Sequence, residues 1–228
     1  MNGPAILAIL VAILVPVTVS AQQLDMVPER ESAGEQPAAM PAEQFDTGYR
    51  PSPTVSLRLQ RAFLDRVRWS SGTEARDQLA AAFAERAPVD IWHDLVAGDG
   101  LERNNVADAL TAYWVLNWVA ANGAYSTRID NAPIQRQLRI AFANDASFHR
   151  LSDQQRQELA EGYILDFLVE HAALNAAVER RDIATLQRLA ASAVTRFRQK
   201  MNVDLLSVEP GPQGFSGRAP APAPTASE

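Results

Sequence analysis

The stretch NNVADALTAYWVLNWVAANG, residues 104–123, restricts the fold more than any other part of this chain. On a helix, at about 100° per residue, almost every position of the stretch is apolar. The exceptions form one narrow polar stripe: Asn104, Asp108 and Thr111. A helix that is apolar nearly all round is surrounded by other elements. Asn105, followed by Asp108, is a capping signal, and Asn122-Gly123 is a stop signal, so the stretch is expected to be a central, buried helix.

One amide interrupts the apolar surface of this helix. Asn117 lies almost opposite the polar stripe, among large apolar neighbours. A buried amide without a hydrogen bond costs about 1–3 kcal/mol, so Asn117 must find a partner. The structural interpretation is a bond to a nearby backbone or side chain, and the indole N–H of Trp114 is a candidate partner.

A second polar residue lies on an apolar seam. The longest predicted helix begins at Ser152 and ends near Arg181, and His171 lies on its apolar face beside Phe167 and Leu174. The structural interpretation is that Asn117 and His171 are buried separately. The functional alternative is that both line one cleft. Apolar clefts with a few converging polar groups are a usual form of small-molecule site. The candidate ligand-binding residues are therefore Trp114, Asn117, Trp118 and His171.

The other helical signals extend from about Thr54 to about Val208. Apolar residues recur at helical spacing throughout this region, and strand signals are nearly absent outside NVDLLSVEP. Further helix starts are indicated by Thr73, Pro88, Asn131 and Asp182. We predict an all-α fold, a compact bundle of about six to seven helices with orthogonal or mixed packing, formed by a single domain at residues 54–208.

The segments on both sides of this domain have the composition of disordered polypeptide. Residues 22–53 carry six acidic residues against two arginines and contain few large apolar side chains. Residues 209–228 end in the alternating GRAPAPAPTASE. Such segments bury too little apolar surface to offset the entropy of ordering, so we predict a disordered acidic linker and a disordered Pro/Ala-rich tail.

The first residues have the pattern of a signal for export. An apolar block at residues 5–15 is shorter than the roughly 18–20 residues of a membrane span, and Val19-Ser20-Ala21 places small residues at a cleavage site. We predict a signal peptide at residues 1–21, no transmembrane span after its cleavage, and a periplasmic or secreted protein of a Gram-negative-type bacterium. The alternative is an uncleaved N-terminal anchor.

Composition excludes several kinds of chemistry. The chain has no cysteine, which removes disulfides, thiol catalysis and thiolate metal sites. Its basic residues are scattered, so no nucleic-acid partner is predicted. Asp90, His93 and Asp94 have a spacing that could bind a metal, but a solvated helix edge has the same pattern, and no metal is predicted. No catalytic motif or cofactor fingerprint is present, so no catalytic residue and no cofactor are predicted.

The segment GLERNNVADALTAYWVLNWVAANG resembles a family of secreted bacterial proteins known as a domain of unknown function. Members resemble this chain in having an N-V-A-D-A element, a Trp-rich helix, and an ending similar to Asn202–Leu205 before Gly214-Phe215. The similarity covers about Tyr49 to Phe215, and it implies export and an all-helical body. The family commonly has a small apolar residue at the position of Asn117, so the resemblance assigns Asn117 no shared catalytic role.

The leading hypothesis for function is an exported binding module. Its ligand would be a partner protein, an envelope component or an apolar small molecule. The reason is that the sequence predicts a complete helical core but contains no recognisable set of catalytic residues. One alternative is an enzyme that uses His171 as general base in an apolar, Trp-lined cleft, helped by Glu170 or Asp166. Another alternative is a structural spacer.

Overall fold

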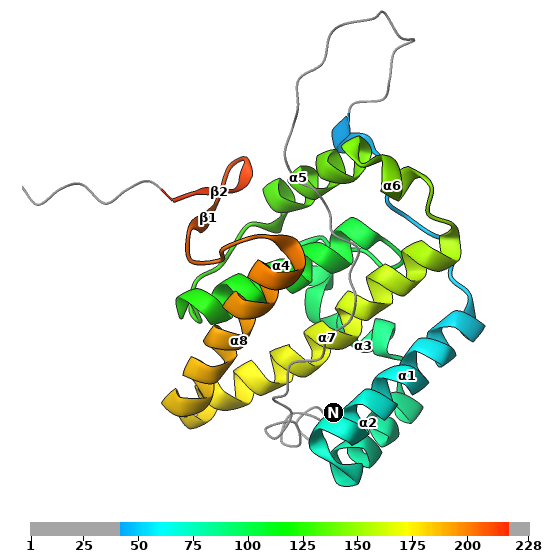
Figure 1. The fold of residues 1–228 in the computed structure, drawn as a ribbon, viewed down its shortest axis with the longest axis vertical. Helices are drawn as coiled ribbons and strands as arrows, with labels where there is room; N and C mark the ends of the chain where they lie inside the picture. The colour runs from blue at the N-terminus through cyan, green and yellow to red at the C-terminus, as the bar shows by residue number, and fades with distance from the viewer. Residues whose placement is uncertain (1–41, 219–228) are drawn as a thin grey trace, which may run out of the picture.

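The computed structural model describes residues 42–218, which form an all-α body with a small C-terminal hairpin (Figure 1). The eight helices of this region are α1 (Pro53–Ser71), α2 (Thr73–Glu85), α3 (Pro88–Val96), α4 (Val106–Asn122), α5 (Asn131–Asn144), α6 (Ala146–His149), α7 (Asp153–Arg180) and α8 (Ile183–Met201). Two short 3-10 helices, η1 (Ala42–Gln44) and η2 (Ala97–Asp99), and the strands β1 (Val208–Gly211) and β2 (Gly214–Gly217) complete it. The predicted signal peptide and most of the predicted linker lie outside the described residues.

The predicted all-α class is confirmed, with one helix more than the predicted six to seven. The additional helix is α6, a single turn. Asp145 caps this turn by accepting a hydrogen bond from the backbone of Ser147, and Phe148 anchors it in the core. So short a helix has no apolar period of its own, which is why helical spacing does not reveal it.

Helix α4 is the central element, as predicted. Thirteen of its side chains are buried, and it packs against α5, α7 and α8. The side chain of Asn105 caps its first turn by accepting a bond from the Asp108 backbone, and Gly123 ends it in the left-handed region at φ 64°. The polar stripe is also inside the protein, because Asp108 and Thr111 are both fully buried.

Helix α7 crosses the whole body (Figure 1), with α4 and α5 on one side and α1 and α2 on the other. Ser152 and Gln155 form the predicted capping box at its start. Asp182 caps α8, as predicted, through the backbone and hydroxyl of Thr185. Helix α5 differs slightly from the prediction, since Asp130 rather than Asn131 provides its cap.

At the N-terminal side, residues that precede the predicted domain at 54–208 contact the helical body. Thr47 is fully buried, and its hydroxyl donates to Asn105 Oδ1 over 2.6 Å. The backbones of Tyr49 and Val106 donate to Asn104 and Thr47, which ties this segment to the start of α4. Local composition missed it because its few apolar side chains pack against a distant part of the chain.

The ordered body also extends at its C-terminal side, where the disordered tail was predicted to begin at residue 209. Strands β1 and β2 form an antiparallel hairpin, and the buried Phe215 packs it onto α4. Gly214 has φ +93°, and a Cβ there would lie 2.3 Å from Gln137 Oε1, so only glycine fits. The polar and glycine-rich composition of this segment gave no sign that the single large side chain of Phe215 would pack it onto α4.

Within residues 42–218, none of the helices combines the length and the apolar character needed to cross a membrane.

Candidate functional site

Of the four predicted ligand-binding residues, only His171 lines the cavity described below. Trp114 stacks on Phe215 of the hairpin, with ring centroids 5.3 Å apart and planes 17° from parallel. The indole N–H of Trp118 donates to the backbone oxygen of Val208 over 2.9 Å. These two tryptophans hold the C-terminal hairpin, whereas His171 lines a cavity on another side of α4 and α7.

Asn117 is buried and forms structural hydrogen bonds, but with partners other than Trp114 and His171. Its amide nitrogen donates to the Tyr113 backbone oxygen over 2.8 Å, and its amide oxygen accepts from Arg196 Nη2 over 2.7 Å. The indole nitrogen of Trp114 is buried without a hydrogen bond among the described residues. Asn117 therefore forms its hydrogen bonds with neither the Trp114 indole nor His171.

Arg196 joins this amide to a carboxylate on α7. Its Nη2 also lies 2.7 Å from Glu170 Oε1, and both side chains are mostly buried, at 23% and 18% exposure. Burial raises the pKa of Glu170 to about 7, while the positive charge of Arg196 limits the rise. Arg196 lies on α8 and Glu170 on α7, so the packing of the two helices brings them together.

The elevated pKa of Glu170 predicts a stability that falls with rising pH. Between its usual pKa of 4.5 and its folded pKa of about 7, the folded state binds more protons than the unfolded chain. The free energy of unfolding must then decrease as the pH rises through this window. Glu170→Gln retains an acceptor for Arg196 but does not titrate, so its slope should be shallower. Thermal melts from about pH 5 to about pH 8 measure the slope, and an unchanged slope would contradict the assignment.

The candidate site is the cavity that contains His171, called here the His171 cavity. It has a volume of about 350 Å³ and is enclosed by α3, η2, α4, α7 and the loop before α5. Apolar and polar side chains both line it, and Leu116, Phe167 and Leu174 are typical of the apolar ones. The polar groups are Asp99, Tyr125, Thr127, Arg128, Asn131, His171 and Asn175. A cavity that combines apolar side chains with converging polar groups is characteristic of small-molecule sites.

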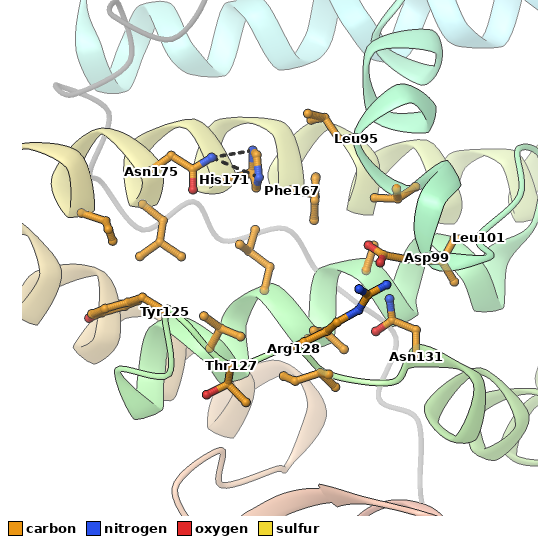
Figure 2. Close-up of a pocket in the computed structure, with 18 residues that line it drawn as sticks. Leu95, Asp99, Leu101, Tyr125, Thr127, Arg128, Asn131, Phe167, His171 and Asn175 are labelled. Carbon is orange, nitrogen blue, oxygen red and sulfur yellow. Dashed lines mark hydrogen bonds between the residues drawn. The ribbon is translucent and has the colours of Figure 1, made fainter.

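The polar groups of this cavity lie on two sides. Figure 2 shows Asp99, Arg128 and Asn131 close together on one side, and His171 with Asn175 on α7 across from them. A second hollow adjoins the first side and shares these three residues. The amide oxygen of Asn131 is buried, and no described residue donates a hydrogen bond to it. The cavity wall thus carries an acceptor that lacks a donor.

His171 is held in a defined orientation on the opposite wall. Its ring stacks on Phe167 with centroids 5.3 Å apart, and the Asn175 amide lies 3.2 Å from Nε2. Burial lowers the pKa of His171 below its usual value of 6.5, so the imidazole is neutral at physiological pH. A neutral ring can accept a hydrogen bond or a proton from a molecule in the cavity.

Three carboxylates of α3 and α7 have structural partners. Glu161 is buried and accepts from Ser56 Oγ and Gln157 Nε2 over 2.7 Å each, which joins α7 to α1. Asp90 pairs with Arg103 at 3.2 Å, and Asp94 pairs with Arg86. These two aspartates beside His93 thus serve as ion-pair partners of arginines.

One of the four tryptophans lies at the surface. Trp92 is fully buried and Trp114 and Trp118 nearly so, but Trp69 at the end of α1 is 86% exposed. Helical spacing places Trp69 on α1, yet the apolar face of that helix is carried by Val55, Phe63 and Val67.

A protein-family model with the description "Family of unknown function (DUF6683)" matches residues 14–204. The chain belongs to this family. The matched range contains all eight helices, the His171 cavity and the pair Arg196–Glu170, whereas the hairpin at residues 208–217 lies beyond it. No curated protein and no solved structure matches the chain. The expected membership in a domain family of unknown function is therefore confirmed.

Proposed function

We propose that this protein is a binding module whose His171 cavity takes a small, largely apolar molecule that carries a hydrogen-bond donor. The single observation that carries the proposal is the amide oxygen of Asn131, buried on the cavity wall without a donor. Native structures rarely leave such an acceptor unpaired, because it costs about 1–3 kcal/mol. An O–H or N–H group of a ligand would satisfy it.

The other walls indicate the rest of the ligand. Apolar side chains from α4 and α7 favour a hydrocarbon body, and the volume of about 350 Å³ is at the lower end of ligand pockets. His171 and Asn175 would contact a second polar group on the far side of that body. Because the imidazole is neutral, an uncharged ligand suits the cavity better than an ion.

Two probes that differ by one hydroxyl test this proposal. Thymol has the O–H donor, and p-cymene has the same carbon skeleton without it. Calorimetry on the full chain should show thymol binding about tenfold more tightly than p-cymene, because only thymol can pair with the Asn131 oxygen. No thymol binding, or equal affinities for the two probes, would contradict the proposal.

Substitution of Asn131 separates binding from stability. Asn131→Leu removes the unpaired acceptor, so the unliganded protein should gain about 1 kcal/mol in free energy of unfolding and lose its preference for thymol. Asn144→Leu is the matched control, since Asn144 is exposed at the other end of α5. It should change neither property. A thymol preference that survives in Asn131→Leu would place the donor elsewhere.

We further propose that the module acts after export, in the periplasm or outside the cell. The signal-peptide pattern of residues 1–21 and the absence of cysteine support this location. Mass spectrometry of the protein expressed with its own N-terminus should find a chain that begins at Gln22. A full-length chain in the membrane fraction would favour an N-terminal anchor instead.

One surface feature supports a protein or an envelope component as the partner. The exposed Trp69 is a side chain typical of interfaces. If pull-down from envelope extracts recovers a partner that Trp69→Ala loses, the ligand is a protein or an envelope component. If neither a partner nor a small molecule binds, the structural spacer is favoured.

An enzyme remains the second candidate, because a neutral His171 faces a cavity. The predicted helpers do not support it, since Glu170 pairs with Arg196 and Asp166 lies closest to Arg66. No tryptophan is among the residues that line this cavity. Turnover in a hydrolase screen that disappears in His171→Gln would favour this candidate over the binding module.

A further inference from the structure

A second and larger cavity lies on another side of the molecule, between α1, α7 and α8, and is called here the Lys200 groove. Its volume is about 680 Å³. Most of its wall is hydrocarbon and aromatic, including Leu59, Phe63, Leu159, Phe197 and Met201. None of its lining residues lines the His171 cavity, so the two are separate sites.

A glycine opens the wall of this groove. Gly162 is in the middle of the long helix α7, where glycine costs about 1 kcal/mol relative to alanine. A Cβ at this position would meet no atom within 4 Å, so no close packing requires the glycine. A larger residue at position 162 would project into the groove, and glycine therefore keeps space there at a cost to the helix.

Among the charged residues that line the groove, the cations outnumber the carboxylates. Arg66, Arg196 and Lys200 line it together with two carboxylates, Asp166 and Glu158. Glu158 pairs with Arg58, and Arg196 has its own partner in Glu170, which lies outside the groove. Asp166 is 3.8 Å from Arg66, and no carboxylate of the described residues lies within 4.0 Å of the Lys200 ammonium.

Lys200 is also the only lysine of the chain. Burial lowers its pKa, and the charge of Asp166 counteracts part of this effect. The hydroxyls of Tyr113 and Tyr163 form no hydrogen bond with any described residue, although both residues line the groove. The groove therefore combines an apolar wall with an ammonium that has no ion-pair partner among the described residues and with two tyrosine hydroxyls.

We propose that the Lys200 groove binds a single-chain amphiphile with an anionic head, its hydrocarbon chain against the apolar wall and its head at Lys200 and Arg66. Such a ligand complements the groove in two ways. Its carboxylate or phosphate would pair with the unpaired cation, and its hydrocarbon chain would pack against the apolar wall. Decanoate is the simplest probe of this chemistry.

A series of probes with one chain and three heads tests the inference on the full-length protein. Calorimetry below the micellar concentration should show decanoate binding about tenfold more tightly than decanol, with decylammonium weakest. Lys200→Met should reduce the affinity for decanoate to that for decanol and leave decanol unchanged. Equal affinities for the three heads, no decanoate binding, or an unchanged decanoate affinity in Lys200→Met would overturn it.

Variants of the wall locate the chain. Gly162→Leu should abolish binding of both decanoate and decanol, whereas Ala191→Leu, at an exposed position of α8, should affect neither. If Gly162→Leu does not fold, the head-group series and Lys200→Met still decide the outcome. Asn131→Leu should leave decanoate binding intact, and its loss there would place decanoate in the His171 cavity and overturn the inference.

Discussion

Arg196→Met is expected to lower the free energy of unfolding by about 3–5 kcal/mol at about pH 8, where Glu170 is ionised. The guanidinium lies 2.7 Å from both the amide oxygen of Asn117 and the carboxylate of Glu170. Its removal leaves a fully buried amide oxygen without a donor and a mostly buried carboxylate without a cation. Either group alone would carry a desolvation penalty, so their combined loss should be large.

The cost of Arg196→Met should be smaller at about pH 5. Since the pKa of Glu170 is about 7, its carboxyl is then protonated and no longer needs a cation. Urea unfolding at the two pH values measures the difference.

Arg198→Met is the matched control, two residues further along α8. Arg198 pairs with Asp204 at 2.7 Å, but the two side chains are 55% and 36% exposed. Exposed pairs contribute about 0–1 kcal/mol, so this variant should be nearly neutral. Equal costs for Arg196→Met and Arg198→Met would mean that the Asn117–Arg196–Glu170 contacts do not stabilise the fold.

Phe215→Ala is expected to cost about 3–5 kcal/mol, as is typical of a buried phenylalanine. The ring is 6% exposed and packs between Trp114 and Trp118, with centroids 5.3 Å and 6.2 Å away. Gln137 fixes the same residue by accepting from its N–H over 2.7 Å and donating to its carbonyl over 2.8 Å. The hairpin should detach from α4 when this anchor is removed.

Two measurements follow the detachment of the hairpin. Urea unfolding gives the loss of stability, and tryptophan emission should shift to the red because water reaches Trp114 and Trp118. Ser216→Ala, at the next and exposed position of β2, should alter neither measurement. A Phe215→Ala protein with unchanged stability and emission would show that the helical body does not depend on the hairpin, which lies outside the family match.

The helices and their ends were largely predictable from the sequence. The centrality of α4 followed from an apolar surface nearly all round it, and Asn105, Gly123 and Ser152 marked helix ends as the structure has them. Capping and helical periodicity depend on residues three or four positions apart, so a short stretch of chain contains the whole signal. The one-turn α6 lacked enough residues to produce that signal.

The candidate sites were much less predictable. His171 was singled out as a polar residue on an apolar seam, and the cavity that it lines includes none of Trp114, Asn117 and Trp118. Asn131 was noted only as a helix start, although its unpaired oxygen is now the central feature of the His171 cavity. Gly162 received no functional interpretation, because the role of a glycine within a helix depends on the side chains that surround it.

By itself, the sequence determined that this chain is helical, which stretch lies at its centre, and that Asn117 needs a buried partner. Only the tertiary structure decided that the partner is Arg196, 79 positions away, and that Phe215 folds back onto the tryptophans. The reason is physical. Helix formation and capping are satisfied within one or two turns, whereas the pairing of a buried polar group depends on which helix faces meet after packing.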